Sequence, residues 1–220
     1  MGRELSIITA LHKKTSRDYL KRMSDNKIEC MTVARRYDSD YWDGDRRYGY
    51  GGYKYDGRWK IVAEKLIAAY NLKDSAHILD VGCGKGFLLH EFKLLLPNAL
   101  IAGFDISEHA IKNSKEEARG NLFVHSAQSQ YPFKGKEFDL VLSITTLHNL
   151  YIYDLKAALQ EIERVGRNTY IVVESYRDER ELFNLECWAL TCEAFFTPKE
   201  WIWLFKEFGY SGDYEFIYFE

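Results

Sequence analysis

Apolar residues along this chain gather into short continuous runs, and segments with apolar positions at helical spacing separate these runs. Buried strands are predicted within residues 77–87, 99–107, 121–127, 137–150 and 168–176, and a closing strand within residues 213–220. Helices are predicted within residues 15–23, 58–72, 87–97, 107–118, 155–165 and 197–210. Strands that are apolar at every position are typical of a parallel sheet covered on both faces. The pattern therefore predicts an α/β fold with a doubly wound, mainly parallel sheet.

The ends of several helices are marked by residues that start or stop a helix. Ser16 and Ser107 stand where an N-cap is expected, Thr197 precedes Pro198 at a first helical position, and Pro97 ends the third helix. The helix in 58–72 carries one apolar face, formed by Ile61, Val62, Leu66, Ile67 and Tyr70.

Composition and charge narrow the classes of function. The chain has 220 residues, 46% of them hydrophobic and 29% charged, with a formal net charge of −3 and a pI of about 6.1. This balance provides no broad cationic surface, so nucleic-acid binding is not expected. No apolar run is long enough to cross a bilayer and the N-terminus lacks a signal-peptide core, so no membrane association is expected. Four scattered cysteines fit a reduced, cytoplasmic protein.

Two patterns resemble metal sites, and neither meets the requirements of one. Cys187 and Cys192 are spaced more widely than a CxxC pair, and no second pair follows them. The aspartates in residues 38–45 resemble a calcium loop, but Trp42 occupies a ligand position and no glutamate closes the loop. We therefore predict no metal, and a solvated turn at residues 38–45.

The turn after the first strand is rich in glycine and predicts a nucleoside-containing cofactor. Gly82, Gly84 and Gly86 allow a sharp turn and the close approach of a ligand. Asp105 ends the second strand, where a carboxylate can bind both hydroxyls of a ribose. The spacing GxGxG differs from the nicotinamide pattern GxGxxG, and Asp80 before the turn would repel a pyrophosphate. S-adenosylmethionine carries an amine and no phosphate, so it fits this site better.

The motifs "ILDVGCGKGF", "AGFDIS" and "FDLVLSITTLHNL" resemble, in order and spacing, those of class I S-adenosylmethionine-dependent methyltransferases. The resemblance covers residues 59–176 and, more loosely, the helix and strand that close the chain. It implies a Rossmann-like methyltransferase fold and S-adenosyl-L-methionine as cofactor. The cofactor-binding residues that it implies are Asp80, Gly82, Gly84, Gly86, Asp105, Ile106, Ser126, Ala127, Gln128 and Ser143.

Candidate catalytic residues follow the fourth and fifth strands, whose ends face the transferred methyl group in this fold. His148 is a candidate proton acceptor, because an unperturbed imidazole has a pKa near ~6.5; alternatively it caps or packs the short helix. Glu174 is a candidate for orienting an amine or hydroxyl, or else a partner in a salt bridge. Tyr50 is the third candidate, from the segment before the core.

The segment 46–59, "RRYGYGGYKYDGRW", is predicted to form a lid over the ligand. Its glycines allow bending, and its tyrosines provide broad contact area at little entropic cost. The expected substrate contacts are Tyr48, Tyr50, Tyr53 and Tyr55, together with Tyr176 after the fifth strand. The alternative is an aromatic patch that packs the N-terminal helices on the core. The predicted division is an N-terminal helical extension and lid in residues 1–57 and a cofactor-binding catalytic domain in residues 58–220.

The sequence thus predicts an enzyme that methylates an oxygen or nitrogen of a small polar molecule, such as a sugar, a nucleotide-sugar or an amino-acid derivative. A protein or peptide methyltransferase and a non-catalytic partner protein that binds S-adenosylmethionine are the alternatives. The only partner expected is the small-molecule substrate, apart from a second copy of the chain in a homodimer.

Overall fold

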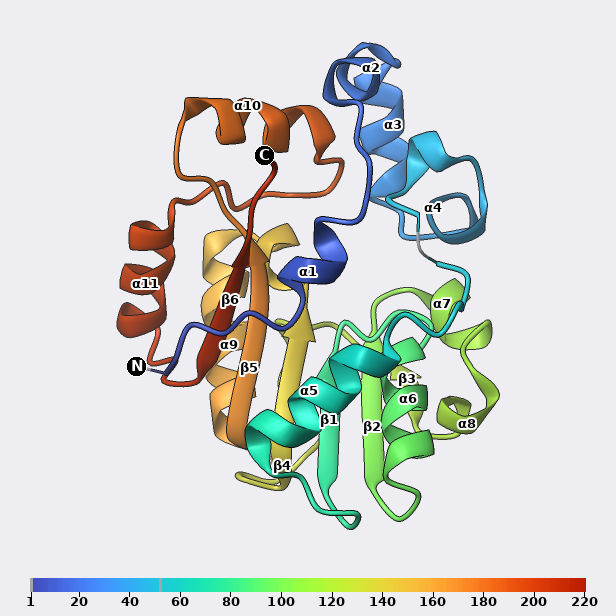
Figure 1. Ribbon diagram of the computed structural model, residues 1–220, viewed down its shortest axis with the longest axis vertical. Coiled ribbons are helices and arrows are strands. Elements are labelled where there is room, and N and C mark those ends of the chain that lie inside the picture. The colour runs from blue at the N-terminus through green and yellow to red at the C-terminus, as the bar shows by residue number, and fades with distance from the viewer. Residues whose placement is uncertain (1, 52) are drawn as a thin grey trace.

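A six-stranded parallel sheet forms the centre of the molecule in the computed structural model, which describes residues 2–51 and 53–220 (Figure 1). The strands are β1 (His77–Val81), β2 (Leu100–Asp105), β3 (Leu122–Val124), β4 (Phe138–Ile144), β5 (Gly166–Glu174) and β6 (Asp213–Ile217). Their order is β3-β2-β1-β4-β5-β6, and every neighbouring pair is parallel. This confirms the predicted doubly wound α/β fold.

Helices cover both faces of the sheet. The helices of the core are α5 (Lys60–Tyr70), α6 (Phe87–Leu95), α7 (Glu108–Lys112), α8 (Glu116–Arg119), α9 (Ile152–Val165), α10 (Glu179–Trp188) and α11 (Pro198–Glu207), with the 3-10 turn η2 (Leu147–Asn149). Helices α5 and α6 lie in front of the sheet and α9 behind it in Figure 1. Among the described residues, no helix combines the length and apolar character needed to span a membrane.

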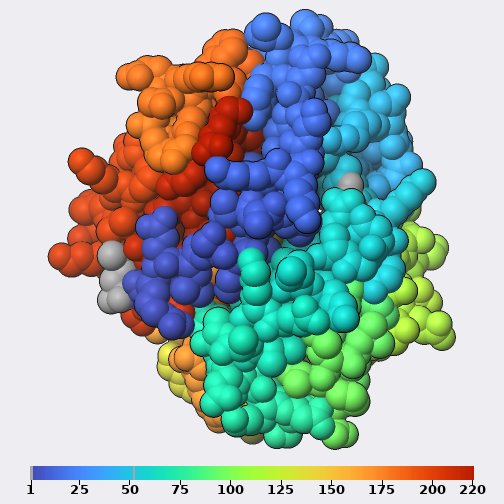
Figure 2. All heavy atoms as spheres, in the orientation of Figure 1, coloured from blue at the N-terminus to red at the C-terminus, as the bar shows by residue number. Residues whose placement is uncertain are grey.

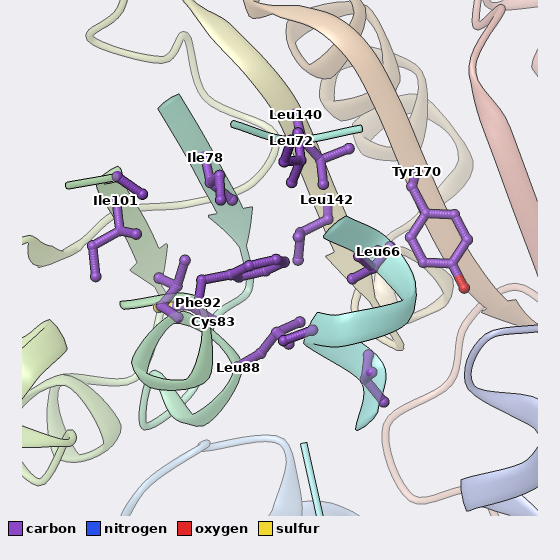
Figure 3. Close-up of a cluster of buried hydrophobic side chains, with 14 of the residues drawn as sticks. Leu66, Leu72, Ile78, Cys83, Leu88, Phe92, Ile101, Leu140, Leu142 and Tyr170 are labelled. Atoms are coloured by element: carbon purple, nitrogen blue, oxygen red, sulfur yellow. The ribbon is translucent and has the colours of Figure 1, made fainter. Parts of the chain in front are cut away.

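Successive residues of each strand enter two different hydrophobic clusters. Ile78 packs with Leu66 of α5 and Phe92 of α6 on one face of the sheet (Figure 3). Its neighbour Leu79 packs with α9 and α11 on the other face. Because successive side chains of a strand point to opposite faces, both faces are buried only if the run is apolar at every position. This requirement explains the continuous apolar runs in the sequence.

The N-terminal residues are attached to the edge of the sheet at β6. Glu4 forms a bridge with Tyr214, and the buried carboxylate of Glu215 accepts hydrogen bonds from the backbone N–H groups of Ile7, Ile8 and Thr9. These N–H groups lie at the start of α1 (Thr9–His12), where a helix has unpaired donors. The dark-blue N-terminal residues consequently lie across the middle of the molecule in Figure 2.

The rest of the N-terminal extension contains short helices that cover the carboxyl ends of the strands. They are α2 (Tyr19–Ser24), α3 (Lys27–Ala34), α4 (Ser39–Asp43) and the 3-10 turn η1 (Arg46–Tyr48). The sequence did not predict α3, and residues 38–45, predicted as a solvated turn, contain α4. Asp38 caps α4 by accepting a hydrogen bond from the N–H of Ser39. In Figure 1 these helices lie above the carboxyl ends of β1 and β2.

Several predicted helix ends are confirmed, and others are wrong. Ser107 caps α7, and Thr197 caps α11 in a capping box with Pro198 at its start. The first predicted cap is wrong, because Asp18 and not Ser16 accepts the hydrogen bond at the start of α2. Residues 107–118 form two helices rather than one, α10 was not predicted, and Ile61 of α5 is 57% exposed.

Candidate functional site

A cavity of about 520 Å³ opens at the carboxyl ends of the strands, where the strand order reverses between β1 and β4. Ligands of doubly wound sheets bind outside this edge, at the point of reversal. The volume falls within the ~300–1,000 Å³ that is common for small-molecule sites. The predicted site residues that line the cavity are Tyr50, Tyr53, Asp80, Gly82, Gly84, Asp105, Ile106, Ser126, Ala127, Gln128, His148 and Glu174.

The glycine turn between β1 and α6 is shaped by residues with positive φ. The backbone angle φ is +79° at Gly82 and +53° at Gly84, and residues with a Cβ rarely adopt such values. A Cβ on Gly82 would lie 2.2 Å from Oγ1 of Thr146, and one on Gly84 would lie 2.7 Å from the ring of Trp42. Gly86 also has a positive φ but does not line the cavity; a Cβ there would lie 2.7 Å from Leu122. Gly86 thus allows close packing against Leu122 and is not placed for the predicted contact with the cofactor.

Asp105 at the end of β2 is fixed by two backbone hydrogen bonds. One carboxylate oxygen accepts from the N–H of Gly84 and the other from the N–H of Ser107, each at 2.9 Å. Burial raises the pKa of Asp105, and these hydrogen bonds oppose that rise. Each oxygen retains a lone pair for a further donor, which the two hydroxyls of a ribose would supply. Ile106, 58% exposed, lines the same cavity beside Asp105.

Asp80 is a buried carboxylic acid that faces the cavity without a hydrogen-bond donor. Within the described residues, no group donates a hydrogen bond to its carboxylate, and its side chain lines the cavity. Burial, and to a smaller extent the charge of Asp105, raises the pKa of Asp80 to about 8. A buried carboxylate without a donor is costly, and an ammonium group would satisfy it. Asp80 and Asp105 together thus suit a ligand with an amine and a ribose.

Ser143 does not contact the cavity, contrary to the prediction. It is fully buried within β4, and its hydroxyl donates a hydrogen bond to the carbonyl oxygen of Val81 at 2.8 Å. The side chain thereby links the adjacent strands β4 and β1 next to the glycine turn. Thr145 and Thr146, which follow β4, line the cavity instead.

His148 is not placed to accept a proton, which corrects its predicted role. Its Nδ1 accepts the backbone N–H of Glu174 at 3.2 Å, so the neutral ring keeps its proton on Nε2. Burial lowers the pKa of His148 to about 3. Nε2 lies 3.5 Å from a carboxylate oxygen of Glu174, so the two side chains are neighbours without a regular hydrogen bond between them. His148 and Glu174 both line the cavity, as expected for residues that follow the fourth and fifth strands.

Glu174 ends β5 and is the titratable carboxyl group nearest to His148. Burial raises its pKa to about 8, and the positive charge of Arg17 partly opposes this rise. A carboxyl group with a pKa close to neutral can exchange a proton at physiological pH. Glu174 is therefore the better candidate for proton transfer at this end of the cavity.

The predicted tyrosine contacts divide into two groups. Tyr50 and Tyr53 line the cavity, whereas Tyr48, Tyr55 and Tyr176 do not. The hydroxyl of Tyr48 donates to Glu29 of α3, and that of Tyr55 donates to Glu91 of α6. Tyr176 packs instead against the hydrophobic cluster that contains Trp188. These three residues are structural contacts.

The hydroxyl of Tyr50 is occupied by the chain itself. It accepts the backbone N–H groups of Leu190 and Thr191 at 2.6 and 3.1 Å, and lies 3.1 Å from Oγ1 of Thr191. Burial raises the pKa of Tyr50, which keeps the hydroxyl neutral. Its ring can contact a substrate, but its hydroxyl is not free for the predicted catalytic role.

Helix α4 closes the cavity over the glycine turn, and the sequence did not predict this contact. The indole Nε1 of Trp42 donates to Oγ of Ser107 at 2.8 Å, while its ring covers Gly84. Asp43 lies 2.6 Å from Lys85 Nζ and 2.7 Å from His109 Nε2. Trp42 between charged residues was a possible signal, since an indole in a solvated turn has no apolar partner.

Comparison with known proteins agrees with this geometry. A family model described as a methyltransferase domain matches residues 72–209. A solved S-adenosylmethionine-dependent methyltransferase from Aquifex aeolicus superposes with a TM-score of 0.52 and 19% identity, over 70% of this chain and 83% of that chain. This structural likeness supports the fold.

Curated relatives match parts of the chain. The human mitochondrial arginine-hydroxylase NDUFAF5 is 32% identical over 50% of this chain and 31% of its own length. Malonyl-[acyl-carrier protein] O-methyltransferase from Legionella pneumophila is 33% identical over 40% of this chain and 31% of its own length. The chain thus spans about a third of the length of these relatives. From the family match and the glycine and carboxylate geometry, we conclude that the chain belongs to the class I S-adenosylmethionine-dependent methyltransferase family, with S-adenosyl-L-methionine as its cofactor.

Proposed function

We propose that this protein transfers a methyl group from S-adenosyl-L-methionine to an oxygen or nitrogen of a small polar molecule. The observation that carries the proposal is the composition of one continuous cavity. Asp80 and Asp105 line one part of it, and Glu174, with its raised pKa, lines another part together with the N-terminal extension. A cofactor site and a proton-accepting group thus share one enclosed space.

The chain's own residues account for binding of the cofactor. Asp80 would hold the amino group, Asp105 the ribose hydroxyls, and Ile106 with Gln128 the adenine. The bound cofactor supplies a methyl group on a positively charged sulfur. The backbone of the glycine turn fixes the position of Asp105 through the N–H of Gly84, so the site is organised before binding.

Glu174, which lies beside His148, would accept the proton of the methyl acceptor. A hydroxyl must lose its proton as the new bond forms, and a positioned base typically contributes ~10²–10⁴-fold to such a step. Glu174 in its ionised form would accept that proton, with Nε2 of His148 3.5 Å from its carboxylate. An amine that arrives neutral would require no base for the transfer.

The enclosure of the cavity supports a small acceptor. Residues of α1, α4 and the segment after η1 form walls of the cavity, including Leu11, Trp42, Tyr50 and Tyr53. This covering leaves little room for a folded protein to reach Glu174. The predicted cytoplasmic location and homodimer remain predictions.

A labelling experiment tests the proposal. The purified protein is incubated with S-adenosylmethionine labelled in its methyl group and with a cell extract, and the products pass through a small-pore filter. We expect label in a new compound in the filtrate and, if the acceptor is a hydroxyl, its loss with Glu174→Gln. Label retained with protein would support peptide methylation instead. Tight cofactor binding without any labelled product would support a non-catalytic binding protein.

A further inference from the structure

Three arginine side chains gather around one tryptophan beside the cavity. The guanidinium carbons of Arg17, Arg22 and Arg46 lie 5.4, 4.9 and 5.4 Å from the ring centroid of Trp188. Arg17 and Trp188 line the cavity that contains Glu174. Arg46 lines an adjoining cavity, and Leu11, Thr15, Tyr50, Gly51 and Arg58 line both cavities. The arginines are therefore next to the space where the acceptor is expected.

None of the three arginines has a carboxylate partner within 4.0 Å among the residues that the structure describes. By contrast, Arg58 on the same side of the cavity forms an ion pair with Asp56. Arg22 donates only to the carbonyl oxygens of residues 46, 47 and 49. Nη1 of Arg17 likewise donates to the carbonyl oxygens of His12 and Thr15, but its Nε is buried without an acceptor in the described chain. The half-buried Arg17 and the buried Arg22 thus lack the anions that normally accompany such guanidinium groups, and the exposed Arg46 lies beside them.

The electrostatics of the cluster favours an anion. Burial lowers the pKa of Arg17 and of Arg22, and the positive charge of Arg46 lowers both further. The nearest carboxyl group in the cavity, Glu174, has its pKa raised to about 8 by burial, so it is mostly protonated near pH 7 and compensates little. Aromatic rings alone can attract cations. Here the three arginines beside the ring of Trp188 would repel a cationic ligand.

Building on the proposed function, we propose that the methyl acceptor carries an anionic group, a carboxylate or a phosphate, which binds Arg17 and Arg46 beside Trp188. Guanidinium groups bind both kinds of oxyanion through paired N–H donors. Arg22, which donates to backbone carbonyls, is a positioning residue that holds the segment around Arg46. The rings of Tyr50 and Trp188 would contact the uncharged part of the acceptor.

Thermal unfolding at constant ionic strength tests this site with two defined probes. Sodium benzoate represents a carboxylate and inorganic phosphate represents a phosphate, with sodium chloride as reference and benzamide as the uncharged counterpart of benzoate. We expect benzoate, phosphate or both to raise the Tm of the wild-type protein above that in chloride. Benzamide should give a smaller increase than benzoate. Whichever probe is active identifies the kind of anion.

Matched variants locate the effect. Arg17→Gln, and likewise Arg46→Gln at an exposed position, should lower the affinity for the active probe by roughly tenfold or more. Each variant loses a charge-assisted interaction with the anion. Arg36→Gln, a change at an exposed arginine outside the cavity, should leave the response unchanged. The proposal is overturned if neither probe exceeds chloride, if benzamide equals benzoate with phosphate inactive, or if Arg36→Gln matches the other two variants.

A separate titration distinguishes this proposal from the proposed function. S-adenosylmethionine should raise the Tm of Arg17→Gln and Arg46→Gln as much as that of the wild type, because neither arginine contacts the cofactor residues named above. If the cofactor binds and the anions do not, only the anion site is wrong. If the anions bind through the two arginines and the cofactor does not, the proposed function fails and the anion site stands.

Discussion

Two carboxyl groups, Asp80 and Glu174, face the same cavity from the ends of β1 and β5, and burial raises the pKa of each to about 8. Near neutral pH both are therefore mostly protonated in the cofactor-free protein. A positively charged ligand beside Asp80 favours its ionised form, so binding of the cofactor should release a proton there. The same residues thus link ligand binding, proton transfer and stability.

The raised pKa of Glu174 gives a pH dependence of stability with a defined sign. In the unfolded chain a glutamate ionises near ~4.3, so between this value and about 8 the folded protein binds more protons than the unfolded one. The free energy of unfolding should therefore fall as pH rises from about 4 to about 8. Glu174→Gln cannot ionise, and it should remove part of this fall.

Thermal unfolding of the cofactor-free protein between pH 5 and pH 9 measures this effect. The difference in Tm between Glu174→Gln and the wild type should therefore depend on pH. It should favour the variant more at pH 9 than at pH 6. Glu163→Gln, at a partly exposed glutamate of α9 remote from the cavity, serves as the control and should follow the wild type. Parallel curves for the wild type and Glu174→Gln would contradict the raised pKa of Glu174 in the folded protein.

At the scale of the elements, α4 covers the cavity together with Tyr50 and Tyr53 of residues 46–59. Trp42 covers Gly84, and Asp43 contacts both Lys85 and His109. The Asp43 side chain is 39% exposed, so solvent screens its contacts with Lys85 and His109. Such weak contacts suit an element that must open to admit ligands.

Replacing Asp43 should loosen α4 without affecting the sheet. Asp43→Asn removes the negative charge between Lys85 and His109, and hydrogen exchange in residues 37–45 should become several-fold faster. Asp56→Asn is the control, because Asp56 lies in the same extension and forms an exposed ion pair with Arg58. This variant should leave exchange in residues 37–45 unchanged. Mass-spectrometric hydrogen exchange with and without S-adenosylmethionine measures both. Equal exchange in Asp43→Asn and the wild type would exclude Asp43 as a closing contact.

Most elements of the core, apart from α10, could be predicted from sequence, while α1, α3 and α4 of the extension could not. Strands such as β1 and β4 show their burial locally, because every residue of the run must be apolar. The position of α4 depends on contacts distant in sequence: Trp42 bonds to Ser107, 65 residues away, and Lys85 bonds to Asp43, 42 residues away. Local periodicity contains no information on such partners.

At the scale of the whole molecule, the candidate site illustrates the same division. The glycine turn and Asp105 were predictable because the turn between strand and helix determines both their types and their spacing. The role of His148 was not, because it depends on its burial and on the backbone N–H of Glu174. The arginines around Trp188 were also missed, since α2, η1 and α10 meet only in the folded chain.

In the proposed assignment, a cofactor region and an acceptor region share one cavity between the sheet edge and the N-terminal extension. This assignment depends first on the binding of S-adenosylmethionine by Asp105. Asp105→Ala removes hydrogen bonds to the ribose that are each worth on the order of 1.5–3 kcal/mol, because the acceptor is charged. Asp139→Ala is a matched control: Asp139 also accepts a backbone N–H of the sheet, at 2.9 Å, but does not line the cavity.

Isothermal titration calorimetry of S-adenosylmethionine against these three proteins is the most direct measurement. We expect one binding site per wild-type chain. The affinity for S-adenosylmethionine should be at least tenfold weaker in Asp105→Ala and equal to that of the wild type in Asp139→Ala. Nicotinamide dinucleotides should show no binding. Absence of binding to the wild type, or equal affinity in Asp105→Ala and Asp139→Ala, would contradict the assignment of the cofactor site.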